Sequence, residues 1–395
     1  MFSKPVILSA VRTAVGSFGG SLKSKTTVDL GTAAVKGAVE RAKITAYKID
    51  EVVLGCVGQY SFNAFLARIV ALKSGCAESS SAQTVNRLCA SGLQGIVTAA
   101  TLIENDGMDI TVGGGAESMS NFPYYLNAAR WGMRMGLGNN SVEDSLTTAL
   151  AEPFTGVNFH IANTAEKVAA QYGISRKDQD EFALQSQERA LAAIQNGFFK
   201  EQIIPVEIED KKQTILFDTD EYPRATTLEK LSSLKPFTKS DGVVTAGNAS
   251  GINDGAAAMV LASEKKAKEL GLRPIARLLD YAVAGVDPSI MGMGPVYSTR
   301  KLLDKTGIPL KDIELIELNE AFAAQAVACI RELGLDPAKV NVNGSGISLG
   351  HPIGATGAVI SVKLIHEMIR RNVRYGISTL CIGGGQGMSA LFEIL

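Results

Sequence analysis

An internal repeat is the feature of this 395-residue chain that most limits its fold. Residues 44–54 (ITAYKIDEVVL) align without a gap with residues 308–318 (IPLKDIELIEL), and each segment follows a stretch of helical periodicity. A second pair, residues 108–120 (MDITVGGGAESMS) and 377–389 (ISTLCIGGGQGMS), occurs in the same order. Two matches in one order predict two similar halves, each with strands alternating with helices, as in a mostly parallel sheet covered by helices.

A long central segment interrupts the repeat. It carries the single tryptophan and a strongly helical stretch, RKDQDEFALQSQERALAAIQ, with Ser175 as its expected N-cap and Gly197 as its expected C-terminal stop. We therefore predict an inserted loop domain at residues 121–247. The N-terminal half then comprises residues 1–120 and 248–272, and the C-terminal half residues 273–395. Insertions of this kind commonly carry substrate contacts on a rigid scaffold.

Composition excludes several classes of function. The net charge of -1 gives no electrostatic reason to expect nucleic acid as a partner. The five cysteines form no CxxC pair and there are only three histidines, so neither a metal site nor a disulfide scaffold is predicted. The sequence contains no run of about 18 consecutive apolar residues, so no membrane span is predicted. We expect a soluble protein of the cytoplasm, and an organelle stays open because a transit peptide can be removed.

The segment VNRLCASGLQG (residues 85–95) places Cys89 between a β-prone run and a helical pattern. Its apolar positions share one helix face: Leu93, Ile96, Val97, Ala100 and Ile103. Free N–H groups and the dipole at a helix N-terminus favour an anion, which predicts a lowered thiol pKa and a better nucleophile. An inert core cysteine remains the alternative on this segment alone.

Three segments of the C-terminal half offer partners for such a thiol. His351 lies in a glycine-rich loop, NVNGSGISLGHPIGATGAV, where it can face a cleft. Cys381 ends a β-prone run directly before three glycines, which permit close backbone approach and can aim N–H groups at a carbonyl oxygen. Asn319 and Glu320 lie where a strand gives way to a helix. Each of these residues, taken alone, also fits a structural role.

Together the motifs resemble the thiolase family. The matching segments, in the family's order over essentially the whole chain, are VNRLCASGLQG, GGGAESMS, TAGNASGINDGAAA, NEAFA, GHPIGATGA and CIGGGQG. The resemblance implies a five-layered α/β/α/β/α fold of two similar halves, with an inserted loop domain that binds coenzyme A. It also implies homodimers, often paired into homotetramers.

The resemblance also implies roles for individual residues. Cys89 is then the nucleophile that carries the acyl group as a thioester, and His351 accepts its proton. Cys381 is the second acid/base, which acts on the α-carbon of the other substrate. Asn319 holds a water that forms one oxyanion hole with His351, and the backbone N–H groups of Cys89 and Gly383 form the other.

Three further positions resemble the family's coenzyme A contacts. His160 and Ser250 match positions near the pantetheine, and Arg224 matches the residue at the nucleotide end. The substrates implied are acetyl-CoA, acetoacetyl-CoA or other 3-ketoacyl-CoA thioesters, and free CoA. No metal or redox cofactor is expected, since the thioester sulfur already activates the α-carbon. Cys56, Cys76 and Cys329 are expected to be core or surface thiols.

Three departures from the family pattern concern the acyl pocket. The loop CVGQYSFNAFLAR (residues 56–68) is bulkier than usual, Gly344-Ser345-Gly346 replaces Gly-Gly-Ala, and Ile161 replaces a usual methionine. The leading hypothesis is an acetyl-CoA C-acetyltransferase that condenses two acetyl-CoA and catalyses the reverse thiolysis. The alternatives are a 3-ketoacyl-CoA thiolase of broader chain length in fatty-acid β-oxidation, a carrier-protein-dependent ketosynthase, and a non-catalytic CoA-binding scaffold subunit.

Overall fold

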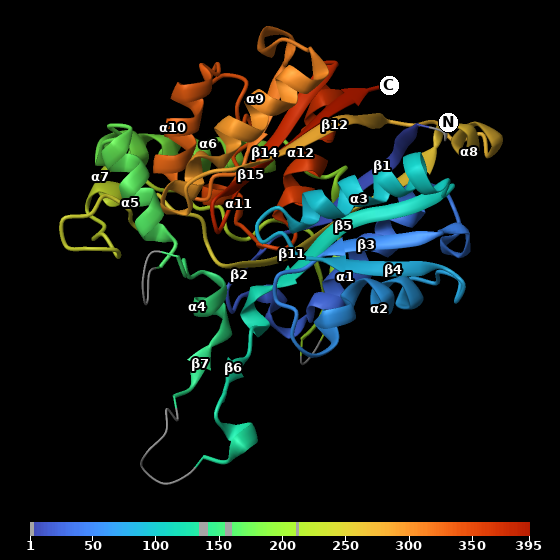
Figure 1. Cartoon of the computed structure of the whole chain (residues 1–395), viewed down its shortest axis with the longest axis horizontal. Helices are drawn as coiled ribbons and strands as arrows, with labels where there is room; N and C mark the ends of the chain where they lie inside the picture. The colour runs from blue at the N-terminus through green and yellow to red at the C-terminus, as the bar shows by residue number, and fades with distance from the viewer. Residues whose placement is uncertain (1–3, 134–140, 155–159, 211–212) are drawn as a thin grey trace.

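The computed structural model describes residues 4–133, 141–154, 160–210 and 213–395 (Figure 1). Its strands gather mainly in one large mixed sheet, which consists of two parts joined where β1 meets β12 through the single pair Ile7 and Ala276. Each part belongs to one half of the chain.

In the N-terminal half the strand order is β4-β3-β5-β11-β1. Strands β3, β4 and β5 are parallel, whereas β11 runs antiparallel to both β5 and β1. The elements are β1 (Pro5–Thr13), β2 (Gly16–Ser17), α1 (Thr27–Arg41), β3 (Glu51–Gly55), α2 (Leu66–Lys73), β4 (Ser81–Val85), α3 (Ser91–Asp106), β5 (Ile110–Ser118), β11 (Asn253–Ser263) and α8 (Glu264–Glu269).

The C-terminal half repeats this arrangement. Its strand order is β13-β14-β15-β12, with β13 and β14 parallel and β15 antiparallel to both of its neighbours. Val340 pairs with Ile316 in a single parallel bridge at the position that β4 occupies in the other half. The elements are β12 (Ala276–Gly285), α9 (Gly294–Thr306), β13 (Leu315–Leu318), α10 (Ala323–Leu333), α11 (Gly346–Leu349), α12 (Thr356–Arg371), β14 (Tyr375–Ile382) and β15 (Gln386–Ile394).

The ladders test the predicted repeat directly. The first sequence alignment matches residue 44 with residue 308, an offset of 264, and so makes β3 the counterpart of β13. Val53 pairs with Gly113 and its counterpart Glu317 pairs with Ser378, so β5 corresponds to β14 with an offset of 265. The second sequence alignment, with an offset of 269, joined the right strands but was wrong by four residues. The expected mostly parallel sheet is also corrected, because a tight glycine turn joins β14 to β15 and can connect only antiparallel neighbours.

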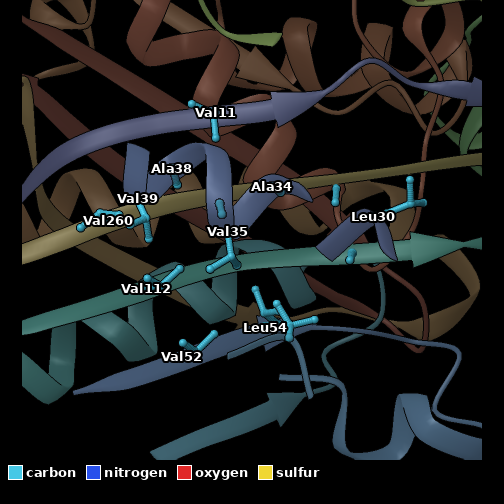
Figure 2. Close-up of a cluster of buried hydrophobic side chains, with 14 of the residues drawn as sticks. Val11, Leu30, Ala34, Val35, Ala38, Val39, Val52, Leu54, Val112 and Val260 are labelled. Atoms are coloured by element: carbon cyan, nitrogen blue, oxygen red, sulfur yellow. The ribbon is translucent and has the colours of Figure 1, made fainter. Parts of the chain in front are cut away.

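Side chains alternate between two cores on either face of each sheet. In the N-terminal sheet Val52 and Leu54 face outward onto α1, while Val53 faces inward. Figure 2 shows the outer core, in which valines from β1, β3, β5 and β11 surround Ala34 and Val35 of α1. Helices α3 and α12 form the inner layer between the sheets, and α9 and α10 cover the outside of the C-terminal sheet. This is the five-layered α/β/α/β/α fold that was predicted.

The segment between β5 and β11 contains the long predicted helix. It is α6 (Arg176–Gln195), which begins with a capping box between Ser175 and Asp178 and is followed by Gly197 at φ +71°. The other elements of this segment are β6 (Tyr124–Tyr125), β7 (Glu143–Asp144), α4 (Ser145–Ala149), α5 (Ala162–Gln171), β8 (Ile203–Ile204), β9 (Val206–Asp210), β10 (Gln213–Phe217) and α7 (Leu228–Ser232). In Figure 1, β6 and β7 form an arm that projects from the body.

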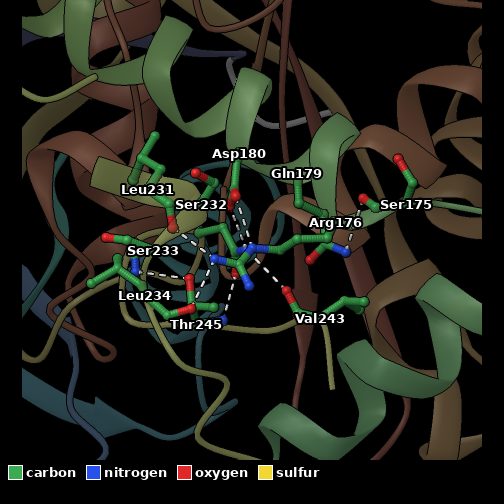
Figure 3. A network of polar contacts seen from close by, with 12 residues as sticks. Ser175, Arg176, Gln179, Asp180, Leu231, Ser232, Ser233, Leu234, Val243 and Thr245 are labelled. Atoms are coloured by element: carbon green, nitrogen blue, oxygen red, sulfur yellow. Dashed lines mark hydrogen bonds and ion pairs between the residues drawn. The ribbon is translucent and has the colours of Figure 1, made fainter. Parts of the chain in front are cut away.

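Polar contacts attach this segment to the rest of the chain. Arg12 of β1 is fully buried and forms a bidentate ion pair with Asp220. Its Nη1 donates to Oδ1 at 2.7 Å and its Nη2 to Oδ2 at 2.8 Å. Within the segment, Arg176 of α6 donates to Asp180 and to the carbonyl oxygens of Leu231 and Leu234, which ties α6 to α7 (Figure 3). Among the described residues, no helix is long and apolar enough to cross a membrane, and no three His, Cys, Asp or Glu side chains are grouped so as to hold a metal ion.

Candidate active site

Cys89 lies in a strained turn between β4 and α3. Leu88 adopts a left-handed backbone conformation with φ +45°, which is costly for a leucine and persists only when its surroundings enforce it. The Ser91 hydroxyl stabilises the turn, since it accepts from Arg87 N at 2.8 Å and donates to Leu88 O at 2.7 Å. The turn leaves Cys89 half-buried, two residues before the first residue of α3.

Two glycines bring the halves together at this point. A Cβ on Gly92 of α3 would lie 2.8 Å from Ala355 O and 2.8 Å from Ala358 N. A Cβ on Gly357 of α12 would lie 2.6 Å from Leu93 N. The first turns of α3 and α12 therefore touch backbone to backbone, which requires glycine on both sides. This contact brings the loop of Cys89 to the loop of His351.

His351 is buried, and its hydrogen bonds define its tautomer. Thr356 Oγ1 donates to Pro352 O at 2.8 Å, so it accepts from His351 Nδ1–H at 2.6 Å. His351 Nε2 thus keeps its lone pair, with Asn319 Nδ2 at 3.5 Å. Burial lowers the pKa of His351 to about 4, so the ring is neutral near pH 7.

Cys381 is fully buried near the end of β14, and one residue, Ile382, separates it from the turn of Gly383, Gly384 and Gly385. Gly384 and Gly385 have φ of +78° and +84°, which explains the glycine run. The Gly383 N–H lies close enough to the Cys89 sulfur to lower the pKa of its thiol. The two thiols also interact, because a charge on Cys89 raises the pKa of Cys381.

The expected lowered pKa of Cys89 is wrong. Burial raises the pKa of its thiol to about 11, although the Gly383 and Cys89 N–H groups pull in the opposite direction. The thiol lies before the helix rather than on it, in an apolar cavity, beside a histidine that is itself neutral. Burial also raises the pKa of Cys381 well above its ordinary value. Both sulfurs are therefore thiols at rest.

A cavity of about 230 Å³ collects most of the predicted residues. Its lining includes Cys89, His160, Ser250, His351 and Cys381. Asn319 lies behind it, next to His351, and its Oδ1 is buried without a hydrogen-bond partner. Gly383 adjoins it, since a Cβ there would lie 3.3 Å from the side chain of Ile161.

Two of the three predicted coenzyme A contacts, His160 and Ser250, line the cavity, and the third lies outside it. His160 accepts from Ala162 N at 3.1 Å through Nδ1 and meets the Phe237 ring edge to face, and Ser250 N donates to Ala321 O at 2.9 Å. Arg224 is exposed and does not line the cavity. It stacks on the ring of Tyr222, 5.1 Å from its centre, and that ring lies against Gly251 beside Ser250.

Sequence reasoning missed the apolar wall of the cavity. The additional lining side chains include Met119, Leu150, Phe237, Met291, Phe322 and Ile353. Met119, Phe322 and Ile353 stand inside the quoted motifs ESMS, NEAFA and GHPIG, so their neighbourhood was visible in the sequence. Leu150, Phe237 and Met291 come from unrelated stretches and carry no such signal. Thr356, which orients His351, was likewise not singled out.

Comparison with known proteins agrees with this architecture. The family model described as "Thiolase, N-terminal domain" matches residues 5–265, and "Thiolase, C-terminal domain" matches residues 272–394. The chain belongs to the thiolase family. Thiolases are acyltransferases, and the predicted enzyme class is thereby confirmed.

Relatives in the thiolase family match the chain over its whole length. "Beta-ketothiolase BktB" of Cupriavidus necator is 51% identical over 396 residues, with 100% of both chains covered. "Acetyl-CoA acetyltransferase" of Escherichia coli is 50% identical, with 99% of both chains covered. The crystal structure of human mitochondrial 3-ketoacyl-CoA thiolase is 42% identical, with a TM-score of 0.96 over 100% of this chain and 99% of that one.

Proposed function

We propose that this thiolase transfers an acetyl group between CoA thioesters through a thioester on Cys89, condensing two acetyl-CoA to acetoacetyl-CoA and CoA and catalysing the reverse thiolysis. The observation that carries the proposal is the cavity in which Cys89, His351 and Cys381 meet, with the Gly383 N–H close to the Cys89 sulfur. The names of the full-length relatives support the same reaction.

The first half-reaction follows from the protonation states at rest. The pKa of Cys89 is about 11 and that of His351 about 4, so a standing thiolate–imidazolium pair is disfavoured. His351 Nε2 therefore takes the Cys89 proton as the sulfur attacks the acetyl-CoA carbonyl. The N–H groups of Cys89 and Gly383 stabilise the oxyanion, and the departing CoA sulfur takes up the proton.

The second half-reaction uses the other thiol. Cys381 first passes its own proton to His351 Nε2, which is neutral again once the departing CoA has taken the Cys89 proton. The Cys381 thiolate then removes a proton from the α-carbon of a second acetyl-CoA, the resulting carbanion attacks the thioester on Cys89, and the departing Cys89 sulfur takes up the proton held on His351. The unpartnered Oδ1 of Asn319 fits a water that it would hold beside His351, with the other hydrogen of that water on the enolate oxygen. The chemistry needs no metal or redox cofactor, since the thioester itself acidifies the α-carbon. Coenzyme A is a substrate.

A broader chain-length range in fatty-acid β-oxidation is the second candidate. It is favoured by the apolar wall of the cavity, which includes Ile161 where methionine is usual, and by the likeness to human 3-ketoacyl-CoA thiolase. Ser250 and His160 would contact the pantetheine in either case, and Arg224 the nucleotide end.

We also propose that the enzyme acts in the cytoplasm, binds neither nucleic acid nor membrane, and assembles as a homodimer or homotetramer. Two surfaces favour assembly. The edge strand β4 exposes its outer side, and the arm of β6 and β7 carries Tyr124 at 67% and Trp131 at 84% exposure.

The decisive experiment is thiolysis by free CoA of a series from acetoacetyl-CoA to long 3-ketoacyl-CoA. Cys89→Ser should lower kcat by more than about 10³-fold, because the hydroxyl is a much weaker nucleophile. Cys76→Ser, at a buried thiol outside the cavity, is the control. Turnover confined to acetoacetyl-CoA supports the acetyltransferase, and efficient cleavage of long chains supports the alternative. Binding of acetyl-CoA without any turnover would leave only the non-catalytic scaffold.

A further inference from the structure

Glu117 is a fully buried carboxylate that the proposed mechanism does not use. It lies near the end of β5 and accepts hydrogen bonds from three backbone N–H groups, those of Val57 at 2.8 Å, Gly58 at 3.1 Å and Gly354 at 3.0 Å. The Cys56 thiol adds a weaker contact at 3.7 Å. Val57 and Gly58 belong to the unusual loop after β3, whereas Gly354 belongs to the turn after His351. One carboxylate thus links the two halves at the active site.

The Gly354 turn determines the orientation of the His351 ring. Ala355 N and Thr356 N both donate to Pro352 O, at 2.8 and 2.9 Å, which closes the turn around Gly354. The Thr356 hydroxyl, held by the same Pro352 oxygen, accepts from His351 Nδ1. A displacement of the turn would therefore rotate the ring or change its tautomer, and with it the direction of the Nε2 lone pair.

The turn has no free space in which to move toward the N-terminal half. A Cβ on Gly354 would lie 2.4 Å from Glu117 Oε2 and 3.0 Å from both Cys56 Cα and Val57 N. A Cβ on Gly115 of β5 would lie 2.3 Å from Gly354 O. The turn is therefore packed on β5 and on the loop after β3, and Glu117 supplies its hydrogen bond from that surface.

We propose that Glu117 is a positioning residue for His351, acting across the junction of the two halves through the Gly354 N–H and the turn from Pro352 to Thr356. This inference rests on the proposed role of His351 as the proton acceptor of Cys89. The loop after β3 takes part through its two N–H groups and the Cys56 thiol, which gives this departure from the family pattern a structural role next to the catalytic base.

The protonation state of Glu117 provides a specific readout. Burial raises its pKa to about 7, and protonation removes one of the acceptor oxygens on which the turn depends. The other titratable groups considered are two neighbours of Glu117, one residue of β11 and the proposed base. Burial raises the pKa of Cys56 well above its ordinary value and that of Tyr60 to about 12. It also raises the pKa of Asp254 of β11, and it lowers the pKa of His351 to about 4. Burial also raises the pKa of Glu317 of β13 to about 7, so a loss of activity near pH 7 points to Glu117 when Glu117→Gln abolishes it, and it does not point to His351.

The test is Glu117→Gln beside the control Glu367→Gln. Glu367 is also a buried carboxylate with three hydrogen-bonding partners, Asn343, Arg370 and Arg371, but it lies away from the cavity. The measurement is the single-turnover release of CoA from acetyl-CoA, which reports acetylation of Cys89, together with the thermal midpoint of unfolding. We expect Glu117→Gln to slow acetylation by about 10- to 100-fold at little change in KM. Glu367→Gln should lower the midpoint and leave the rate within about twofold.

A pH profile keeps the proposal testable if Glu117→Gln does not fold. Acetylation by the wild-type enzyme should fall as the pH decreases through about 7, and Glu117→Gln, where it folds, should lack this step. A wild-type rate that stays flat between pH 8 and 6, or a Glu117→Gln variant with the wild-type rate, overturns the positioning role. Absence of CoA release in the wild-type enzyme overturns instead the proposed function on which the inference rests.

Discussion

The two halves share one topology and differ at the carboxyl ends of their strands. After β13 the C-terminal half places Asn319, and at the end of β14 it places Cys381. The positions that correspond in the N-terminal half, by the offsets of 264 and 265, are Gly55 and Ala116. Three of the four proposed catalytic side chains therefore come from one half, and the other contributes only Cys89.

Room for a side chain explains this difference. A Cβ on Gly55 would lie 2.2 Å from the carbonyl carbon of Ser91 and 2.5 Å from Gly92 N, so the first turn of α3 rests directly on the end of β3. The same contact holds Cys89 in place. In the C-terminal half the corresponding position holds Asn319, whose side chain lies beside His351. The duplicated scaffold thus carries active-site side chains where one copy leaves no room for a side chain and the other is more open.

The largest effect is expected from a substitution of Cys381 that removes this difference between the halves. Cys381→Ala gives the C-terminal strand the residue type that its counterpart Ala116 already has. Because only the second half-reaction uses this thiol, acetoacetyl-CoA thiolysis should fall by about 10³-fold, while CoA release from acetyl-CoA stays within about threefold. Steady-state and single-turnover assays separate the two. Cys329→Ala, at a buried thiol outside the cavity, is the control, and equal loss in both assays by Cys381→Ala would contradict the division of roles.

A second prediction tests the tight packing of the N-terminal half. Gly55→Ala should lower the free energy of unfolding by about 3 kcal/mol, because the new methyl group must displace backbone at the start of α3. Urea unfolding measures this change. The matched control is Gly285→Ala in β12, where a Cβ meets nothing within 4 Å. Similar stability of both variants would show that packing does not exclude a side chain at the end of β3.

The correspondence between the two halves could be predicted in outline from the sequence, because both halves show the same order of strand and helix periodicity. Its second alignment slipped by four residues because it matched glycine runs that serve different purposes. Gly113 to Gly115 lie inside β5, where neighbouring backbone approaches closely, whereas Gly383 to Gly385 form a turn. A pattern of letters does not distinguish a glycine needed for space from one needed for positive φ.

Local reasoning about the site met a similar limit. The motif residues Cys89, His351 and Cys381 were found, and the structure brings them to one cavity. The pKa of Cys89 was misjudged because its apolar surroundings come from segments distant in sequence, such as Leu150 and Met291. Glu117 was quoted within a motif, but its partners Val57 and Gly354 become visible only when both halves are assembled.

A third prediction concerns two buried titratable groups, one from each half, with opposite pH dependence. The folded-state pKa of His351 is about 4, below its unfolded value, so its contribution to stability is present above about pH 6.5 and is lost as the pH falls toward 4. The folded-state pKa of Glu117 is raised to about 7, so its contribution is present below its unfolded pKa and is lost as the pH rises through 7.

The two contributions can be separated by substitution. Between pH 7 and 5 the wild-type protein should lose about 2 kcal/mol through His351, and His351→Asn should lack this loss. Urea unfolding of both proteins at the two pH values gives the comparison. In Glu117→Gln the loss between pH 7 and 5 should instead be larger than in the wild type, because the opposing contribution is gone. Parallel pH dependence in all three proteins would contradict both assignments.

The smallest effect is expected at Gly346 of the C-terminal half, where the family pattern usually has alanine. A Cβ there would lie 2.8 Å from Asn319 Oδ1 and 2.8 Å from Glu320 O. Gly346→Ala should therefore shift the Asn319 amide and lower kcat for acetoacetyl-CoA thiolysis by about fivefold, or about 1 kcal/mol.

The neighbouring departure provides the control for this variant. Ser345 has a buried hydroxyl without a hydrogen-bond partner, so Ser345→Gly removes an unsatisfied polar group and should leave kcat unchanged. The double variant restores the usual Gly-Gly-Ala sequence and should behave as Gly346→Ala does if space behind Asn319 is what matters. Full activity in Gly346→Ala would contradict this expectation. It would mean that the Asn319 amide keeps its working position even when a methyl group is added at residue 346.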